Sequence, residues 1–208
     1  GHARKINCFP ENFGTPAVMA YAYDQNPMVS AVLPDDETSA YQMTRYLIRK
    51  GHKKIALLAG REDNLHTRRR LKGYQNALFD AQILYNPRLV RYVDWNKPSG
   101  YQETKRLLKE DITAIFCMAD TIAGGVYQYL DEQGLRAGRD VSVVGFDNQV
   151  LSEYMIPGLT TMALPLKEIG TTSAKLLFDQ IEKGEVEMNR EILIPCFLVE
   201  RCSVKEIK

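Results

Sequence analysis

Four apolar segments of the sequence are each followed by polar side chains that could bind a small molecule. The segments end near residues 59, 93, 118 and 146, and the residues after them include Arg70, Trp95, Asp120 and Asp147. An ionised carboxylate accepts hydrogen bonds from two neighbouring hydroxyls, an arginine fork donates to hydroxyl or ring oxygens, and an indole face covers the C–H side of a sugar. These residue types together predict a site for a polyhydroxylated ligand.

Each of these residues also has a structural interpretation. Asp120 precedes an apolar helical pattern, so we favour a helix N-cap over a ligand contact as its main role, while keeping it among the site candidates. Trp95 could equally be a half-buried residue at the edge of the core. Asp147 directly follows a strand too apolar to be exposed, which makes it the strongest single candidate.

Arg68, Arg69 and Arg70 are consecutive and could suggest a patch that binds nucleic acid. Consecutive helical residues point about 100° apart, so three adjacent arginines cannot form one basic stripe. We therefore expect one arginine to face the ligand and the others to face solvent.

The elements that must position these residues follow an alternating pattern. Short β-rich runs are expected at residues 17–19, 29–33, 54–59, 89–93, 114–118, 141–146, 192–194 and 197–199. Helical periods are expected from Asp36 to about residue 50, at 67–81, from a capping box at Ser99 through residue 108, at 120–133 and at 166–181. Repeated strand–helix–strand units predict an α/β fold with parallel sheets, and such sheets bind ligands beyond the carboxyl ends of their strands.

Composition excludes several classes of protein. In 208 residues, 45% are hydrophobic and 25% charged, which is typical of a folded globular chain. The net charge of +1 gives no general attraction to nucleic acid or to an anionic membrane. No apolar run approaches the roughly 20 residues that span a bilayer, and no signal peptide precedes the first strand, so we expect a cytoplasmic protein without a membrane partner.

The sequence also contains no recognisable catalytic or metal motif. It has no phosphate-binding loop, nucleophile elbow or dinucleotide fingerprint. The histidines His2, His52 and His66 have no partner at helical spacing, and the four cysteines show no C-x-x-C pair. We expect no enzyme activity, no cofactor and no metal, with His52 packed or hydrogen-bonded at a helix–strand corner.

Four motifs in this order resemble one known family. They are GHKKIALLAG at residues 51–60, RLKGY at 70–74, VVGFDN at 143–148 followed by PGLTT at 157–161, and LVERCS at 198–203. The chain is similar over residues 16–203 to the lac repressor/galactose repressor family of bacterial transcription regulators. The departures include Ala119, where many sugar-binding members have Asn, and Leu164, where some members have Gln.

The resemblance implies a type I periplasmic-binding-protein-like fold, with two doubly wound parallel-sheet subdomains joined by crossovers and an effector cleft between them. One subdomain would hold residues 1–33 and 164–192, and would be incomplete; the other would hold residues 34–163 and 193–208. By the family pattern Arg70 and Asp147 bind effector hydroxyls, Trp95 takes the place of a stacking aromatic, and His66 and Tyr21 line the pocket. The resemblance also implies a homodimer.

The family begins with a DNA-binding headpiece that has no counterpart before Gly1. The expected function is therefore the effector-sensing core of a transcription regulator, with a sugar or sugar derivative as effector and with operator DNA bound only through a headpiece outside this chain. The alternative is the solute-binding protein of a sugar transporter, which shares the fold. An α/β enzyme such as a sugar hydrolase or kinase is a third, less favoured hypothesis.

Overall fold

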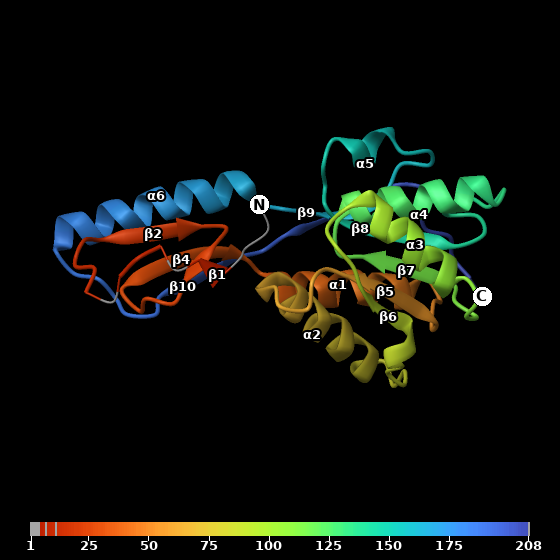
Figure 1. Cartoon of the computed structure of the whole chain (residues 1–208), viewed down its shortest axis with the longest axis horizontal. Helices are drawn as coiled ribbons and strands as arrows, with labels where there is room; N and C mark the ends of the chain where they lie inside the picture. Colours follow the sequence, from red (N-terminus) through yellow and green to blue (C-terminus); the bar gives the residue numbers. More distant parts are fainter. Residues whose placement is uncertain (1–4, 7, 11, 208) are drawn as a thin grey trace.

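The largest of the three sheets in the described residues lies in the right-hand lobe in Figure 1. The computed structural model describes residues 5–6, 8–10 and 12–207. The order of strands in this sheet is β11-β9-β8-β7-β5-β6, and every neighbouring pair is parallel except β11 with β9. The strands are β5 (Ile55–Ala59), β6 (Val90–Tyr92), β7 (Ala114–Cys117), β8 (Ser142–Asp147), β9 (Thr160–Ala163) and β11 (Phe197–Val199).

Helices cover both faces of this sheet. One apolar core lies between the sheet and α1 (Asp36–Arg49) and α2 (Leu65–Asp80), and a second core lies between the sheet and α3 (Lys97–Leu107) and α4 (Asp120–Glu132). A short 3-10 helix (Pro87–Leu89) precedes β6, and a four-residue helix α5 (Leu151–Tyr154) follows β8. The lobe is therefore a doubly wound α/β unit whose central strands β5, β7 and β8 are buried on both sides, as their largely apolar sequences predict.

The second lobe is built around a parallel sheet with the order β10-β4-β2. Its strands are β2 (Ala17–Ala20), β4 (Val29–Pro34) and β10 (Glu191–Ile194), and α6 (Leu166–Lys183) packs on β2 and β4. A small pair of strands, β1 (Lys5–Ile6) and β3 (Tyr23–Asp24), lies beside them. The chain passes between the lobes after β4, after β9 and after β10, which gives three crossovers (Figure 1).

The sequence pattern located most of these elements, and the differences have local causes. The predicted capping box at Ser99 is wrong, because α3 begins at Lys97 and its N-cap is Asn96, whose side chain accepts from the Ser99 backbone N–H. The helix predicted at 67–81 begins two residues earlier, since Asn64 caps it. Strand β9 was not predicted, because the Thr160–Ala163 run contains only two apolar residues.

His52 has the structural role that the sequence suggested. Its ring is fully buried, with Nδ1 2.9 Å from Thr113 Oγ1 and Nε2 3.0 Å from the Lys205 carbonyl oxygen. The prediction of a hydrogen-bonded histidine at this corner is confirmed.

Gly73 lets α1 and α2 approach closely, and this contact gives a first prediction. A Cβ at Gly73 would lie 2.1 Å from the Glu37 carbonyl oxygen, whereas a Cβ at Gly170 in α6 would meet nothing within 4 Å. We expect Gly73→Ala to lower the free energy of unfolding by about 1–3 kcal/mol through overpacking. Gly170→Ala should raise it by about 0.5–1 kcal/mol through helix propensity. Urea denaturation of both variants checks the pair, and a neutral or stabilising Gly73→Ala would contradict the close packing.

Candidate functional site

Arg70 is the centre of a buried polar cluster at the carboxyl ends of the large sheet. Its side chain, carried by α2, is 1% exposed. Its Nε donates to Asp36 Oδ1 at 2.7 Å, one terminal nitrogen donates to the Met118 carbonyl oxygen at 2.5 Å, and the same nitrogen lies 3.9 Å from Asp147 Oδ1. The guanidinium also lies on the Phe146 ring, 3.5 Å from its centroid. The arginine is thus held rigidly between two carboxylates.

Asp36, which sequence reasoning did not select, is the main partner of Arg70. The N-cap of α1 is Asp35, which accepts from the Thr38 N–H, so the Asp36 side chain is not needed for capping. Burial by itself would raise the pKa of Asp36, but the charge of Arg70 and the hydrogen bond with His66 hold that pKa below its usual value. One signal in the sequence could have pointed to Asp36. Asp35 and Asp36 are consecutive acids at the start of a helix, and one of them is enough to cap it.

His66 and Tyr21 join the two lobes at this cluster. His66 Nδ1 lies 2.5 Å from Asp36 Oδ2, and the imidazole is fully buried. Tyr21 follows β2 of the smaller lobe, and its ring stacks on the imidazole with centroids 5.0 Å apart and planes 23° apart. Burial raises the pKa of Tyr21 to about 12, so the phenol stays neutral and can donate. The Nε2 atom of His66 is buried and has no hydrogen-bond partner among the described residues.

Asp147, like His66, brings to this cluster a buried polar atom that lacks a hydrogen bond. Its Oδ2 accepts from Gln149 Nε2 at 3.0 Å, whereas Oδ1 has no hydrogen-bond donor in the described part of the chain. Burial raises the pKa of Asp147 to about 6, and the charge of Arg70 opposes that rise. The carboxylate is therefore mostly ionised at neutral pH, with one oxygen available.

Backbone strain marks the same positions. Asp147 has φ 111°, Asn148 has φ 55° and Tyr21 has φ 59°. Non-glycine residues in this region cost of order 1–3 kcal/mol each and occur preferentially at functional sites. The two lobes thus each contribute a strained residue to one cluster.

Trp95 lies at the edge of the cluster. Its indole lies so close to Gly60 that a Cβ there would be 2.0 Å from a ring carbon, and its ring centroid is 6.0 Å from the Arg70 guanidinium carbon. The side chain is half-buried and packs against both cores, which agrees with the core-edge interpretation without excluding a ligand contact.

Asp120 has a different role from the one predicted. The N-cap of α4 is Ala119, without a side-chain hydrogen bond, so the prediction that Asp120 caps this helix is wrong. Its two carboxylate oxygens accept from the Thr161 hydroxyl at 2.7 Å and from the Gln149 backbone N–H at 2.8 Å. Because both oxygens are engaged, Asp120 holds the loop that follows Asp147 in place, and we assign it a positioning role in the site.

The titration of Asp120 gives a second prediction. Burial raises its pKa to about 7, with the Thr161 hydrogen bond opposing and the charge of Asp147 adding to the rise. The folded chain then holds this proton more tightly than the unfolded chain, whose aspartates have a pKa near 3.9. The free energy of unfolding should therefore fall as pH rises from about 4 to about 7.

Asp120→Asn is the matched control, since an amide resembles the protonated acid. The difference in unfolding free energy between wild type and Asp120→Asn should change across this pH range. Other groups, Asp147 included, titrate in both proteins, so this difference reports the titration of Asp120. Urea denaturation at several pH values measures it, and parallel curves would contradict the raised pKa.

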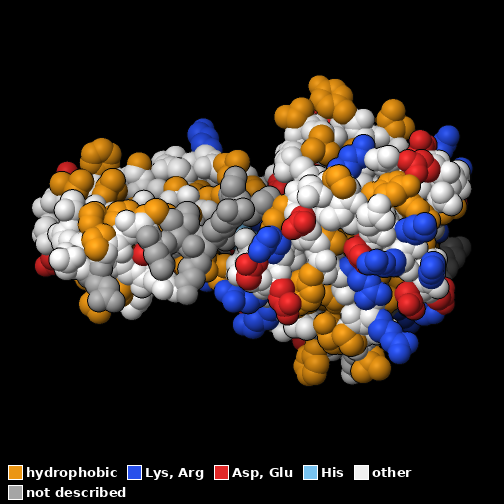
Figure 2. All heavy atoms as spheres, in the orientation of Figure 1, with side chains coloured by type: hydrophobic (Ala, Val, Ile, Leu, Met, Phe, Trp, Pro, Cys, Tyr) orange, Lys and Arg blue, Asp and Glu red, His pale blue; other side chains and the backbone are white. Residues whose placement is uncertain are grey.

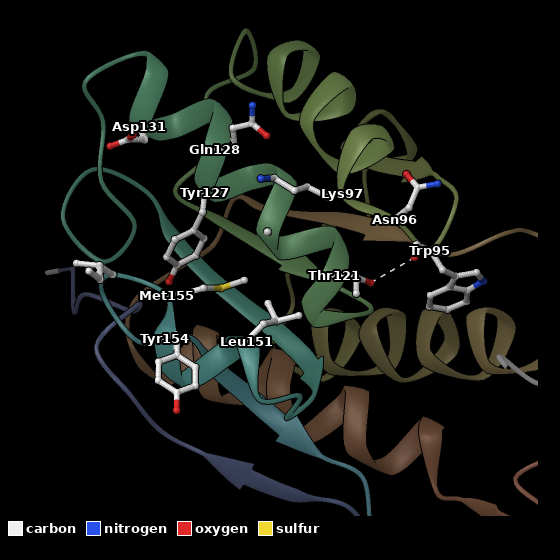
Figure 3. A pocket seen from close by; sticks show the side chains of 12 residues that line it. Trp95, Asn96, Lys97, Thr121, Tyr127, Gln128, Asp131, Leu151, Tyr154 and Met155 are labelled. Carbon is white, nitrogen blue, oxygen red and sulfur yellow. Dashed lines mark hydrogen bonds between the residues drawn. The ribbon is translucent and has the colours of Figure 1, made fainter.

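A separate groove of about 850 Å³ lies beside the cluster and shares only Trp95 with it. Figure 3 shows its walls, formed by the start of α3, one side of α4 and the α5 segment. The Thr121 hydroxyl donates to the Trp95 carbonyl oxygen at 3.3 Å and ties these walls together. This groove is therefore not the place where the buried charges meet.

No helix in the described part of the chain is long and apolar enough to cross a membrane. No three or more of the described His, Cys, Asp and Glu side chains gather as a possible metal site; His2 lies outside the described residues.

Two lobes, three crossovers and a polar cluster between the lobes define a two-lobed receptor domain of the periplasmic-binding-protein type. The sequence profile of the "Periplasmic binding protein-like domain" matches residues 44–204. The chain belongs to this domain family and is an effector-binding core of the lac repressor/galactose repressor family, so the expected fold and family are confirmed.

Individual relatives are similar over most of the chain. The transcriptional repressor PurR of Vibrio atlanticus is 33% identical over 190 residues, covering 88% of this chain and 55% of the relative. The ribose operon repressor of Haemophilus influenzae is 34% identical, covering 85% and 54% respectively. A LacI family regulator from Enterococcus faecium, solved with bound ribose, superposes with a TM-score of 0.82 at 34% identity, covering 93% of this chain and 72% of that structure. The chain spans about half the length of the curated relatives it matches.

Proposed function

We propose that this chain is the effector-sensing core of a transcription regulator and that its effector is a sugar or sugar derivative. The observation that carries the proposal is the cluster of Arg70, Asp147, His66 and Tyr21, which spans both lobes and holds two buried polar atoms without hydrogen-bond partners. A ligand hydroxyl donates well to a carboxylate oxygen and to an imidazole nitrogen. The ribose bound by the regulator from Enterococcus faecium supports a carbohydrate.

The cluster also suggests how binding becomes a signal. A ligand can shift an equilibrium between lobe arrangements only by contacting one arrangement better than the other. A sugar that touches Asp147 on the large lobe and Tyr21 on the small lobe meets that condition, because the two residues belong to different sheets. The signal would reach operator DNA through a headpiece outside this chain, in the cytoplasm, and no catalysis or cofactor is required.

A thermal-shift screen tests the proposal. The purified chain is heated with ribose first, then with other pentoses, hexoses, cellobiose and nucleosides, and hits are confirmed by isothermal titration calorimetry. A ligand at about 100 times its dissociation constant should stabilise the fold by roughly 2.7 kcal/mol. Glycerol at the same concentration controls for general polyol effects. If no carbohydrate raises the melting temperature, the carbohydrate proposal is wrong.

The solute-binding protein of a sugar transporter remains the alternative, since it shares the fold. The curated relatives are transcriptional repressors, which favours the regulator. We expect the longest natural chain that contains this sequence to bind an operator. The present chain alone should show no sequence-specific DNA binding, because reading the bases requires a helix or strand placed in a groove of the DNA. Specific retention of operator DNA by the present chain would contradict this division of roles.

We further propose that the protein works as a homodimer through the groove beside α4 and α5. Tyr154 and Ile156 at this groove are 77% and 92% exposed, and Figure 2 shows hydrophobic side chains gathered on the surface over α5. An apolar surface of this kind is typical of an interface, and a twofold axis would bring the same patch of two copies together.

Tyr154→Asp should therefore shift the longest natural chain from dimer to monomer at micromolar concentration, as measured by analytical ultracentrifugation. Phe79→Asp is the matched control, because Phe79 is also 82% exposed but belongs to α2. A wild-type monomer, or equal dissociation by both variants, would count against this interface.

A further inference from the structure

The cluster around Arg70 contains more negative than positive charge. Arg70 already pairs with Asp36 at 2.7 Å, and Asp147 is a second carboxylate 3.9 Å from the same guanidinium. The neighbouring Arg69 and Arg61 have carboxylate partners outside the cluster: Arg69 pairs with Glu191 at 2.8 Å and Arg61 pairs with Asp63 at 3.2 Å. Of the side chains in the cluster, two carboxylates thus face the single guanidinium of Arg70.

The contact between His66 and Asp36 fixes what the imidazole can offer. An ionised Asp36 is an acceptor only, so Nδ1 of His66 carries the proton and donates to Oδ2 at 2.5 Å. The buried Nε2 atom of His66 has no partner among the described residues, so a ligand hydroxyl could be its partner. Asp147 Oδ1 is a carboxylate acceptor without a hydrogen bond, and it requires a hydroxyl or amine donor from a ligand.

We infer that the site selects an uncharged polyol and rejects its phosphorylated form, with the His66–Asp36 pair as the specificity-determining element. This inference rests on the proposed function and names the class of sugar. A phosphate group has negative charge and few donors at neutral pH, so beside the carboxylates of Asp36 and Asp147 it would meet like charge and leave Asp147 Oδ1 unpaired. Rejection by unpaired buried polar groups is the strongest form of discrimination available to a binding site.

Titration calorimetry of matched pairs at pH 7.5 tests the inference. Ribose is compared with ribose 5-phosphate, and glucose with glucose 6-phosphate. Within a pair that binds, we expect the affinity for the free sugar to be at least 100-fold higher than the affinity for its phosphate. A phosphate that binds as tightly as its free sugar, or more tightly, would overturn this inference and leave the proposed function intact. Binding of neither member of either pair, together with a negative sugar screen, would contradict both.

Asp36→Asn tests the role of the pair. The substitution removes one negative charge from the cluster, so that Asp147 is the one carboxylate left beside Arg70 in the described residues. The affinity for the free sugar divided by the affinity for its phosphate should therefore fall at least tenfold. Asp111→Asn is the control with the same change of net charge, because Asp111 pairs with Lys54 away from the cluster. The ratio should stay at the wild-type value in this control.

Because Asp36 is buried, the variant's circular dichroism and melting temperature are measured first. If Asp36→Asn does not fold, Asp147→Asn is used instead, since it removes the second carboxylate from the cluster and should lower the same ratio. An unchanged ratio in the folded variant would exclude charge at this cluster as the source of specificity.

Discussion

Asp147→Asn should weaken binding of the sugar identified by the screen about ten- to a hundredfold while leaving the fold nearly as stable as the wild type. The buried Oδ1 atom has no hydrogen-bond donor in the described residues, so a ligand hydroxyl would be its partner. A hydrogen bond to a charged group contributes about 1.5–3 kcal/mol, and 1.4 kcal/mol corresponds to tenfold in affinity. Calorimetry gives the affinity and differential scanning fluorimetry the melting temperature.

Asn is a better replacement than Ala at this position for a conformational reason. Asp147 has φ 111°, and Asn tolerates positive φ better than Ala does. Asp147→Ala should therefore lose the same affinity and additional stability. Trp95→Ala should weaken sugar binding less, through lost apolar cover. If Asp147→Asn lowers the melting temperature strongly but leaves affinity unchanged, Asp147 is a structural residue and leaves the site.

The sequence was sufficient to predict the architecture of the large lobe because its strands are buried on both faces. Residues 54–59, 114–118 and 141–146 are apolar apart from Lys54, Ser142 and Gly145, and each range was expected as a strand of a parallel sheet that the structure contains. Strands β1, β3 and β9 were not predicted. Two of them are only two residues long. Strand β9 begins with two threonines: the Thr160 hydroxyl accepts from the Arg201 backbone N–H, and the Thr161 hydroxyl donates to the Asp120 carboxylate.

Site residues at the ends of strands could be predicted from the sequence. Contacts between residues far apart in the sequence could not. Asp147 is the last residue of β8, and Trp95 follows β6 closely, so the rule that ligands bind at the carboxyl ends of strands located both. Asp36 contacts His66 and Arg70, which lie 30 and 34 residues further along, and no local pattern reports such a pairing. The role of Asp120 was wrong for the same reason, because its partners Thr161 and Gln149 become neighbours only in the folded sheet.

Arg70→Met should destabilise the fold more than any other single change considered, by about 3–5 kcal/mol. The substitution leaves Asp36 as an uncompensated carboxylate with a side chain that is 0% exposed, and breaking one partner of a buried pair has an effect of that size. It also removes the donor to the Met118 carbonyl oxygen at the end of β7. Urea denaturation, with the slope of the transition checked against wild type, measures the loss.

The double variant Arg70→Met with Asp36→Asn separates the charge from the packing. If the loss comes from the unpaired charge, removing that charge as well should restore a large part of the stability, because neutral side chains of similar volume are well tolerated at such sites. His66 would then face an amide oxygen instead of a carboxylate and could keep its Nδ1 hydrogen bond. A double variant no more stable than Arg70→Met would show that the arginine contributes through its contacts with Phe146 and Met118 and not through its charge.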